Sequence, residues 1–378
     1  MNIKDFIEII DKEFFVGVPD STLTPLTDYL YLKHGISKNH IVAANEGNAV
    51  AIAAGYHLAT GKIPVVYFQN SGLGNAVNPV CSLLSPQIYG IPCIFIIGWR
   101  GEPGTKDEPQ HVFQGEITTK LLDNLDIDYI VVDKSTSKQE LSNTVKETNS
   151  KLKEGKSFAF VIKKGALENE HKVKFKNAHT LYREEIIDIL TQEFKDAIIV
   201  STTGKASREL FEIRERNKQS HDKDFLTVGS MGHCSSIALG IALQKPEKQI
   251  LCIDGDGSLL MHLGAMALIG ANAPSNFIHI VINNGAHESV GGLPSVGEKI
   301  KFNEIAKSCG YKNCFSLSDE IELKKALETL KTTKELTFLE VKAQIGARQD
   351  LGRPTIPPIV NKKQFMINLH KGVEQCKQ

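Results

Sequence analysis

Residues 251–285, LCIDGDGSLLMHLGAMALIGANAPSNFIHIVINNG, contain the pattern that most limits how this chain can fold. The apolar runs at 250–254 and 277–282 have the length and composition of buried strands, and we predict one helix over 259–271 between them. This order of elements is that of a β-α-β unit in a parallel sheet. In such sheets the carboxyl ends of the strands lie at one edge, where ligands bind.

Each of these two predicted strands is followed by a polar turn. GDGS at 255–258 offers the carboxylate of Asp256 between two glycines, and NNG at 283–285 offers amide oxygens. Oxygen ligands of these kinds suit Mg²⁺ or Ca²⁺, and Mg²⁺ commonly connects a protein carboxylate to phosphates. The two turns therefore predict a site for a metal-bound diphosphate, although two ordinary strand-end turns would give the same pattern.

The composition narrows the class of protein. A chain of 378 residues is long enough for two α/β domains. Its 44 basic and 44 acidic side chains balance, which argues against a nucleic-acid or membrane-surface partner. The seven cysteines form no CxxC pair, so we interpret them as reduced thiols. Neither a signal peptide nor an apolar run long enough to cross a membrane is recognisable, and we expect a cytoplasmic enzyme.

Both halves of the chain alternate strand-like apolar runs with helical patterns. The predicted fold class is therefore α/β, with two doubly wound parallel-sheet domains. The polar segment 163–180 separates the two patterns. We place the domains at 1–165 and 182–378, with an interdomain linker at 166–181.

Two segments are predicted to be irregular. The run GWRGEPGTKDEPQHVFQG at 98–115 is unusually long for a loop in a compact domain, which is typical of functional or disordered segments. The Gly-rich segment 285–298 is interpreted as a mobile loop that closes over a substrate, as lids do; a flexible turn is the simpler alternative.

GDGS followed by NN after one helix resembles the signature of the thiamin-diphosphate-dependent enzymes, and Leu239-Gly240 and Pro246 fit its longer form. The resemblance covers nearly the whole chain. It implies that the first domain binds the aminopyrimidine ring of thiamin diphosphate and the second binds the diphosphate. A central third domain found in many larger relatives is absent, because the predicted linker is too short to hold it.

The resemblance also implies roles for individual residues. Glu46, in NEGNAVAIAAGYHLATGK, matches the glutamate that bonds the aminopyrimidine, and the GSM segment matches the part that contacts the cofactor's bend. Asp256, Asn284 and the carbonyl of Ala286 match the ligands of Mg²⁺, although a reading shifted by one residue would favour Asn283. The implied cofactor-binding residues are Glu46, Gly229, Ser230, Met231, Gly255, Gly257, Ser258 and Asn284.

The chemistry of such a site agrees with these roles. Removing the carboxylate of a 2-oxo acid leaves a carbanion that no side chain can stabilise, whereas a thiazolium ring can act as the electron sink. A carboxyl beside the pyrimidine favours the imino form that removes the thiazolium proton. Taken alone, Glu46 would be read as a first-turn acid favoured by the helix dipole.

Four local segments narrow the resemblance to the phosphonopyruvate decarboxylase family. They are GVPDSTL at 17–23, NSGLGNAVNP at 70–79, GWRGEPG with DEPQH within 98–111, and NNGAHESVGG at 283–292. The resemblance implies decarboxylation of 3-phosphonopyruvate to phosphonoacetaldehyde and CO2 in phosphonate biosynthesis, with thiamin diphosphate and Mg²⁺. Thr22 and Glu288 depart mildly from the pattern, where leucine and aspartate are often found.

A substrate with a carboxylate and a phosphonate needs cations or N–H donors, and arginine binds such groups through two parallel bonds. The substrate-binding candidates are Ser71, Gly72, Arg100, Lys106, His111 and His287. Asp20 and His111 are also candidates for proton transfer, and Asp107 for ordering these groups. Solvated loop charges and turn capping are equally good explanations of these residues.

Three alternatives remain. Sulfopyruvate decarboxylase uses the same cofactor, but its two domains are often separate chains, so the fusion here favours phosphonopyruvate. A Rossmann dehydrogenase is disfavoured because no GxGxxG follows the first strand. A non-catalytic thiamin-diphosphate-binding subunit is the third alternative. The resemblance further implies a homo-oligomer, at least a dimer, with the active site between chains.

Overall fold

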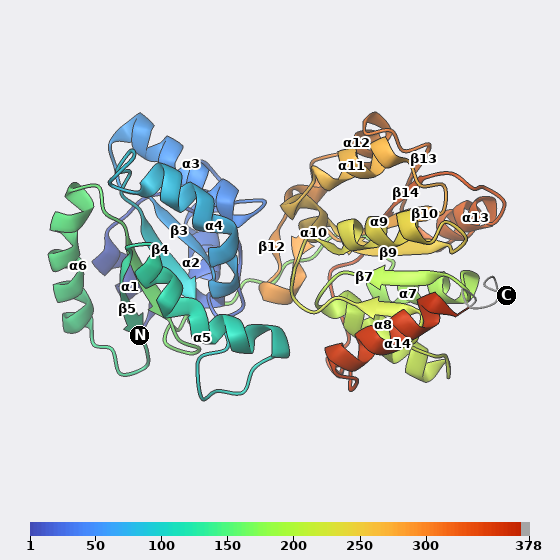
Figure 1. Cartoon of the computed structure of the whole chain (residues 1–378). Helices are drawn as coiled ribbons and strands as arrows, with labels where there is room; N and C mark the ends of the chain where they lie inside the picture. Colours follow the sequence, from blue (N-terminus) through green and yellow to red (C-terminus); the bar gives the residue numbers. More distant parts are fainter. Residues whose placement is uncertain (372–378) are drawn as a thin grey trace. The chain divides into compact units, whose positions relative to one another are not determined.

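The computed structural model describes residues 1–371 and divides the chain into two compact units, Met1–Lys174 and Phe175–Gln378 (Figure 1). Each unit is a six-stranded sheet with helices on both faces, in agreement with the predicted fold class. All strand pairs within the two sheets are parallel. No helix in the described part of the chain is both long and apolar enough to span a bilayer.

The first sheet has the strand order β2-β1-β3-β4-β6-β5. Its unit consists of α1 (Ile3–Ile10), β1 (Phe15–Gly17), α2 (Thr24–His34), β2 (His40–Val42), α3 (Glu46–Thr60), β3 (Val65–Gln69), η1 (Asn70–Gly72), α4 (Leu73–Pro79), η2 (Val80–Leu84), β4 (Ile94–Gly98), α5 (Pro109–Asn124), β5 (Asp128–Val132), α6 (Lys138–Lys153) and β6 (Phe158–Ile162). Small buried residues of α3, including Ala49 and Ala53, let that helix pack closely on the sheet.

The second sheet has the strand order β13-β14-β10-β9-β7-β8. Its unit consists of α7 (Arg183–Glu193), β7 (Ile198–Ser201), α8 (Lys205–Arg216), β8 (Asp224–Leu226), α9 (Cys234–Gln244), β9 (Ile250–Gly255), α10 (Asp256–Met261), α11 (Ala265–Asn272), β10 (Phe277–Asn283), β11 (Ala286–His287), η3 (Glu288–Val290), β12 (Leu293–Pro294), η4 (Val296–Glu298), α12 (Phe302–Ser308), β13 (Asn313–Leu317), α13 (Glu320–Leu330), β14 (Thr337–Lys342) and α14 (Pro358–His370). Figure 1 shows α9 on one face of this sheet and α7 and α8 on the other.

Several element predictions are corrected by the structure. The single helix expected over 259–271 is two helices, α10 and α11, which meet at the turn around Gly264. The second half of the run 98–115 is helical, because α5 begins at Pro109, whose fixed φ suits the first turn of a helix. The segment 285–298 is ordered by the antiparallel pair of β11 and β12.

The far edge of the second sheet is covered by a side chain. Strand β8 is the last strand at this edge, and Asn361 of α14 contacts its backbone. The Asn361 Nδ2 donates to the Asp224 carbonyl at 2.8 Å, and its Oδ1 accepts from the Leu226 N–H at 3.2 Å. The amide therefore forms one donor and one acceptor bond with the strand, as a neighbouring strand would.

Candidate active site

Asp256 follows the carboxyl end of β9. It is the first residue of α10, and its side chain is buried. Its Oδ2 accepts a hydrogen bond from the Ser295 hydroxyl, which comes from the loop after β12. Burial raises the pKa of Asp256 to about 6, although the Ser295 bond opposes the shift. The loop that was expected to be mobile therefore folds directly over this carboxyl group.

Asn283 ends β10, the neighbouring strand, and its amide is fully buried. The Nδ2 donates to the Gly297 carbonyl and to Glu340, both at 2.8 Å. A Cβ on Gly297 would stand 2.7 Å from the Asn283 Oδ1 and 2.8 Å from the Asp256 Oδ2. The loop can pass between these two oxygens only because residue 297 has no side chain.

Asn284 turns its amide nitrogen toward Glu288, at 2.8 Å, and its Oδ1 accepts from the Ala286 N–H at 3.1 Å. Glu288 in turn receives Arg183 at 2.9 Å and Lys205 at 2.6 Å. The two cations and Asn284 thus surround one carboxylate. Because Glu288 accepts a hydrogen bond from the nitrogen of the Asn284 amide, the oxygen of that amide points into the turn.

Arg183 is the centre of the same network. Its guanidinium forms two 2.7 Å bonds with the buried carboxylate of Glu209, in addition to its bond with Glu288. Arg183, Glu209 and Lys205 were not predicted from the sequence. Their positions carry no local motif, because Arg183 and Glu288 are separated by 105 residues.

The other predicted cofactor-binding residues also gather here. A Cβ on Gly257 would stand 3.2 Å from the His287 ring and 3.6 Å from the Met231 methyl, so these three residues from separate segments are close neighbours. Burial lowers the pKa of His287 to about 4, which keeps its imidazole neutral near pH 7. A side chain at 257 would fill this space.

Ser258 ties the surrounding turns together. Its Oγ accepts from the Thr202 hydroxyl at 2.9 Å and from the Gly232 N–H at 3.1 Å. The Gly229 N–H donates to the Thr203 hydroxyl at 3.0 Å, and Ser230 has a positive φ of 47°. The GSM turn is therefore held against the ends of β7 and β9. Ser230 is exposed, and Gly255, at the end of β9, is half-buried.

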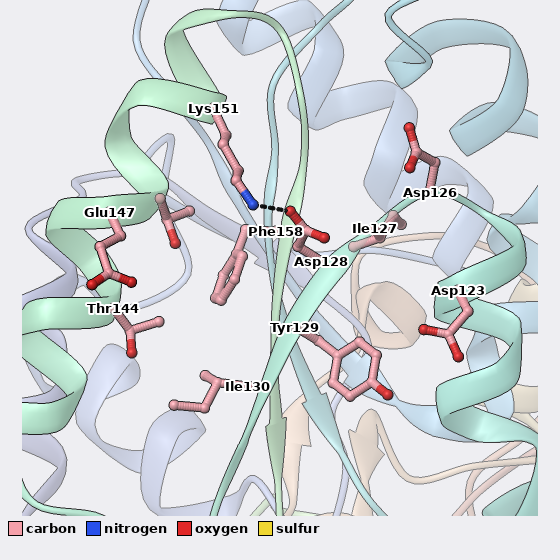
Figure 2. A pocket seen from close by; sticks show the side chains of 11 residues that line it. Asp123, Asp126, Ile127, Asp128, Tyr129, Ile130, Thr144, Glu147, Lys151 and Phe158 are labelled. Atoms are coloured by element: carbon pink, nitrogen blue, oxygen red, sulfur yellow. Dashed lines mark hydrogen bonds and ion pairs between the residues drawn. The ribbon is translucent and has the colours of Figure 1, made fainter.

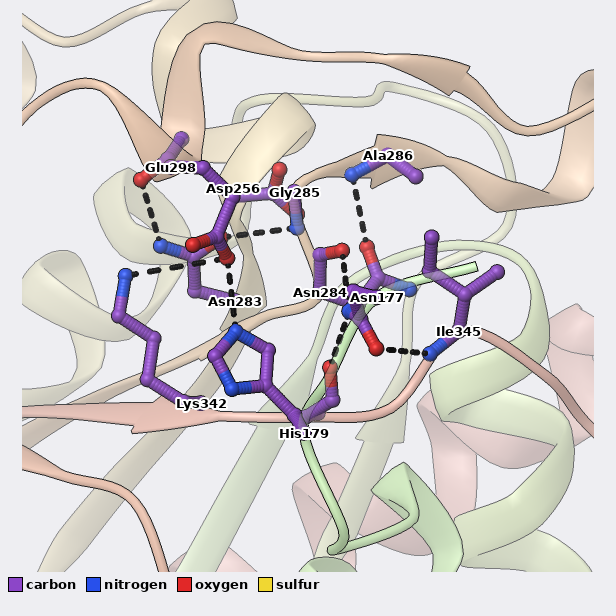
Figure 3. A network of polar contacts seen from close by, with 12 residues as sticks. Asn177, His179, Asp256, Asn283, Asn284, Gly285, Ala286, Glu298, Lys342 and Ile345 are labelled. Atoms are coloured by element: carbon purple, nitrogen blue, oxygen red, sulfur yellow. Dashed lines mark hydrogen bonds and ion pairs between the residues drawn. The ribbon is translucent and has the colours of Figure 1, made fainter. Parts of the chain in front are cut away.

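Residues 175–181, which belong to the predicted linker, pack within the second unit. Asn177 donates to the carbonyls of Asn284 and Ala343 at 3.0 and 2.9 Å, and accepts from the Ile345 N–H at 3.3 Å (Figure 3). His179 contacts Glu298 at 3.0 Å. Asn177, which fixes the backbone of the NN turn, was not predicted from the sequence.

In the first unit, Glu46 begins α3 after the N-cap Asn45 and is buried. Its Oε2 accepts from the Asn75 Nδ2 at 2.8 Å. A Cβ on Gly72 would stand 2.4–2.6 Å from three atoms of the Glu46 side chain. Gly72 is thus the residue that makes room for the carboxyl group.

Asp20 follows β1 and is fully buried. Its carboxylate accepts from the Gln69 amide at 2.6 Å and from the Thr22 N–H at 2.7 Å, and Gln69 also receives the Ser71 hydroxyl at 2.7 Å. Burial raises the pKa of Asp20 against these bonds. Asp20 and Ser71 are therefore joined through Gln69 at the carboxyl ends of β1 and β3.

The basic candidates of the 98–115 segment differ in their surroundings. Arg100 forms a two-point ion pair with Asp107, with Nε to Oδ2 at 2.8 Å, and also donates to the Ser21 hydroxyl at 3.0 Å. Lys106 is exposed. Burial lowers the pKa of His111 to about 4. The Arg100 fork is thus already bonded to the Asp107 carboxylate.

A cavity of about 630 Å³ in the first unit contains none of the predicted site residues. It is lined by the beginning of β5 and by side chains of α5 and α6, including Asp123, Asp128 and Lys151 (Figure 2). This is the amino end of the strand, opposite to the edge where ligands of parallel sheets bind. The candidate residues lie instead at the carboxyl ends of both sheets.

Comparisons with known proteins identify the class of protein to which these two α/β units belong. Residues 4–125 match the N-terminal TPP binding domain of the thiamine pyrophosphate enzymes, and residues 202–341 match their C-terminal TPP binding domain. The chain belongs to the thiamin-diphosphate-dependent enzymes. Within them it is a 2-oxo acid decarboxylase, a carboxy-lyase of the family that includes phosphonopyruvate decarboxylase.

Three relatives illustrate this membership. Phosphonopyruvate decarboxylase of Streptomyces viridochromogenes is 35% identical, over 92% of this chain and 89% of its own. The protein of the same name from Streptomyces hygroscopicus is 32% identical, over 92% and 88%. Sulfopyruvate decarboxylase of Methanosarcina acetivorans is 29% identical, over 85% and 86%.

Proposed function

We propose that this protein decarboxylates 3-phosphonopyruvate to phosphonoacetaldehyde and CO2 in phosphonate biosynthesis, with thiamin diphosphate and Mg²⁺. The observation that carries the proposal is the 35% identity to a phosphonopyruvate decarboxylase over 92% of the chain. The placement of Glu46, Asp256 and Asn284 at the carboxyl ends of strands supports it. We also propose a cytoplasmic homo-oligomer with active sites between chains.

The second unit provides a donor set that fits Mg²⁺. Asp256, Asn284 and the Ala286 carbonyl would supply three oxygen ligands, which this hard cation prefers. Asn283 is the rival ligand, and its Oδ1 lies on the other side of Gly297 from the Asp256 Oδ2. We favour Asn284 because Glu288 binds its amide nitrogen and so fixes which way its oxygen points. Gly257, without a side chain, leaves space for a diphosphate beside Met231 and His287.

When bound, the thiazolium ring supplies the electron sink for decarboxylation. The chain supplies the remaining groups. Glu46 would bond the aminopyrimidine, and Asn75 holds its carboxylate in place. Burial raises the pKa of Asp20, and we propose this residue as the general acid that delivers a proton to the product. His111, neutral at pH 7, would act as a hydrogen-bonding partner.

The sulfonate analogue is the second candidate substrate. The Methanosarcina sulfopyruvate decarboxylase matches this chain over 86% of its own length, so a fused chain does not separate the two activities. Arg100 is bonded to Asp107, which leaves the Ser71 to Gly74 backbone, Lys106 and His287 as the remaining candidates for the phosphonate. The identity to the two phosphonopyruvate decarboxylases, 35% and 32% against 29%, supports phosphonopyruvate as the proposed substrate.

A coupled aldehyde assay with Mg²⁺ and thiamin diphosphate tests the proposal. Phosphonopyruvate, sulfopyruvate and pyruvate are compared at equal concentration. Strong preference for phosphonopyruvate is expected. Preference for sulfopyruvate would replace the substrate and keep the cofactor. Cofactor binding without turnover of any of the three would identify a non-catalytic subunit. Sedimentation of the active holoenzyme as a monomer would contradict the proposed oligomer.

A further inference from the structure

A second group of polar side chains is buried inside the second unit, along β9 and β10, the strands that end at Gly255 and Asn283. Cys252 and Asp254 alternate along β9, and the parallel register places His279 of β10 beside Cys252, so all three point to the same face of the sheet. Cys234, the first residue of α9, covers that face. All four are buried, within a core that includes Val281, Phe338 and Ala238.

Their polar atoms converge. The two Sγ atoms are 3.8 Å apart, and the ligand atoms of Cys234, Cys252 and Asp254 all lie within 4.8 Å of one another. The His279 Nε2 is 3.6 Å from the Asp254 Oδ2. Apart from this mutual contact, neither atom has a hydrogen bond, although both are buried. Buried polar atoms that lack hydrogen bonds are costly, so an ion bound between these groups would stabilise them.

The opposite atoms of the same two side chains are bonded. The Asp254 Oδ1 accepts from the Gly255 N–H at 2.8 Å, and the His279 Nδ1 contacts the Tyr311 hydroxyl at 3.1 Å. These bonds fix the Asp254 carboxylate and the His279 ring, so that the Asp254 Oδ2 and the His279 Nε2 face each other. Metal-binding histidines typically have such a partner on the second ring nitrogen, because it fixes the ring and its tautomer.

We propose that Cys234, Cys252, Asp254 and His279 bind one structural Zn²⁺. Two sulfur ligands about 2.3 Å from a tetrahedral Zn²⁺ stand about 3.8 Å apart, as the two Sγ atoms do here. Nitrogen and oxygen ligands at about 2.0–2.1 Å stand roughly 3.4 Å apart, close to the observed 3.6 Å. Four protein ligands leave no open position, so the ion joins α9 to β9 and β10 and takes no part in catalysis.

Metal analysis and Co²⁺ substitution test the site. Protein purified without chelator and dialysed should retain about one zinc per chain, because closed thiolate sites bind this ion tightly. Protein produced in Co²⁺-supplemented medium should show the thiolate-to-metal charge-transfer band and the ligand-field bands of tetrahedral Co²⁺. The oxygen ligands of the Asp256 site cannot produce a thiolate band, so the variant Asp256→Asn should keep it.

Cys252→Ser is the principal variant, and Cys93→Ser is its matched control, because Cys93 is a buried cysteine of the other unit. Cys252→Ser should lose the charge-transfer band and most of the zinc, whereas Cys93→Ser should keep both. If Cys252→Ser fails to fold, the metal content of the unaltered protein still decides. Metal-free folded protein, or a disulfide between Cys234 and Cys252 found by thiol counting, would overturn the proposal.

Discussion

Replacing Glu288 by glutamine should weaken metal binding at Asn284, although Glu288 is not itself a proposed metal ligand. The Glu288 carboxylate accepts from the Asn284 Nδ2, from Arg183 and from Lys205, at 2.8, 2.9 and 2.6 Å. Glutamine keeps the shape but has one acceptor oxygen and no charge. The cations then compete with Asn284 for that single oxygen, and the Asn284 amide is free to rotate.

The structure indicates how much metal affinity and how much stability this substitution should cost. Loss of a partner that orients a metal ligand typically costs about 10–100-fold in metal affinity. Arg183 keeps its two bonds with Glu209, and Lys205 is partly exposed, so neither cation is left without compensation. The stability loss should therefore be about 1.5–3 kcal/mol, the range for a hydrogen bond to a charged group.

Electron paramagnetic resonance of Mn²⁺, titrated into protein containing thiamin diphosphate, gives the metal Kd. Urea unfolding of the same samples gives stability. Glu209→Gln is the control: it removes the other partner of Arg183 but has no hydrogen bond with Asn284, so it should lower stability and leave the Mn²⁺ Kd within about threefold. An unchanged Kd in folded Glu288→Gln would refute the positioning role.

Three further predictions follow from the first unit. Glu46→Gln should keep cofactor binding, measured by calorimetry, but lose about 10²–10⁴-fold in kcat, the usual contribution of acid–base catalysis; near-normal kcat would exclude Glu46 from proton transfer. Gly72→Ala should lose about 100-fold in kcat/KM, because the added Cβ would displace the Glu46 carboxyl. Gly74→Ala is the control and should stay active, because a Cβ at Gly74 meets no atom within 4 Å. Equal activities of the two variants would contradict this explanation. Burial lowers the pKa of His40 to about 4, below its value of about 6.5 in the unfolded chain, so the unfolded state binds the proton first as the pH falls. The contribution of His40 to the free energy of unfolding is therefore unchanged above pH 6.5. It falls by roughly 3 kcal/mol as the pH drops to 4 and is nearly constant below that. Urea unfolding at pH 7 and 4 should show this loss in the unaltered protein and a smaller one in His40→Gln; identical losses would be the contrary result.

The strands around the site were predictable because they are buried on both faces. The runs at 250–254 and 277–282 were predicted almost to the residue, as β9 and β10, since only central strands of a parallel sheet are apolar without interruption. Strand β13, NCFSL, was missed. It is an edge strand with half-buried side chains, so its pattern is weaker.

The predicted helix 259–271 shows that hydrophobic periodicity alone does not predict where a helix is interrupted. Its residues are mostly good helix formers, and the break between α10 and α11 follows from where the second helix must pack. Gly270 of α11 would place a Cβ 1.7 Å from the Cys309 carbonyl, so the helix runs against the residues after α12. This tertiary contact fixes where α11 lies, and the only local sign of the break is Gly264, a glycine inside the helical pattern.

The contacts that orient the site could not be inferred from the sequence for a related reason. Asp256 and the NN turn were found because each follows its own strand. Ser295, Arg183 and Asn177 reach the same place from segments that are distant in sequence or polar throughout. Their roles depend on which backbone atoms lie within a few ångströms, and this is known only from the folded chain.

The bonds between Asn361 and β8 have a consequence for the behaviour of shortened chains. An open edge strand has unpaired N–H and C=O groups that can recruit a strand of another molecule. In this protein α14 covers that edge and its asparagine occupies the two groups at Asp224 and Leu226. Removing the chain from Pro357 onward would leave every proposed active-site residue in place, yet it would create a self-associating surface on the second unit. The C-terminal helix thus keeps the sheet from growing beyond its sixth strand.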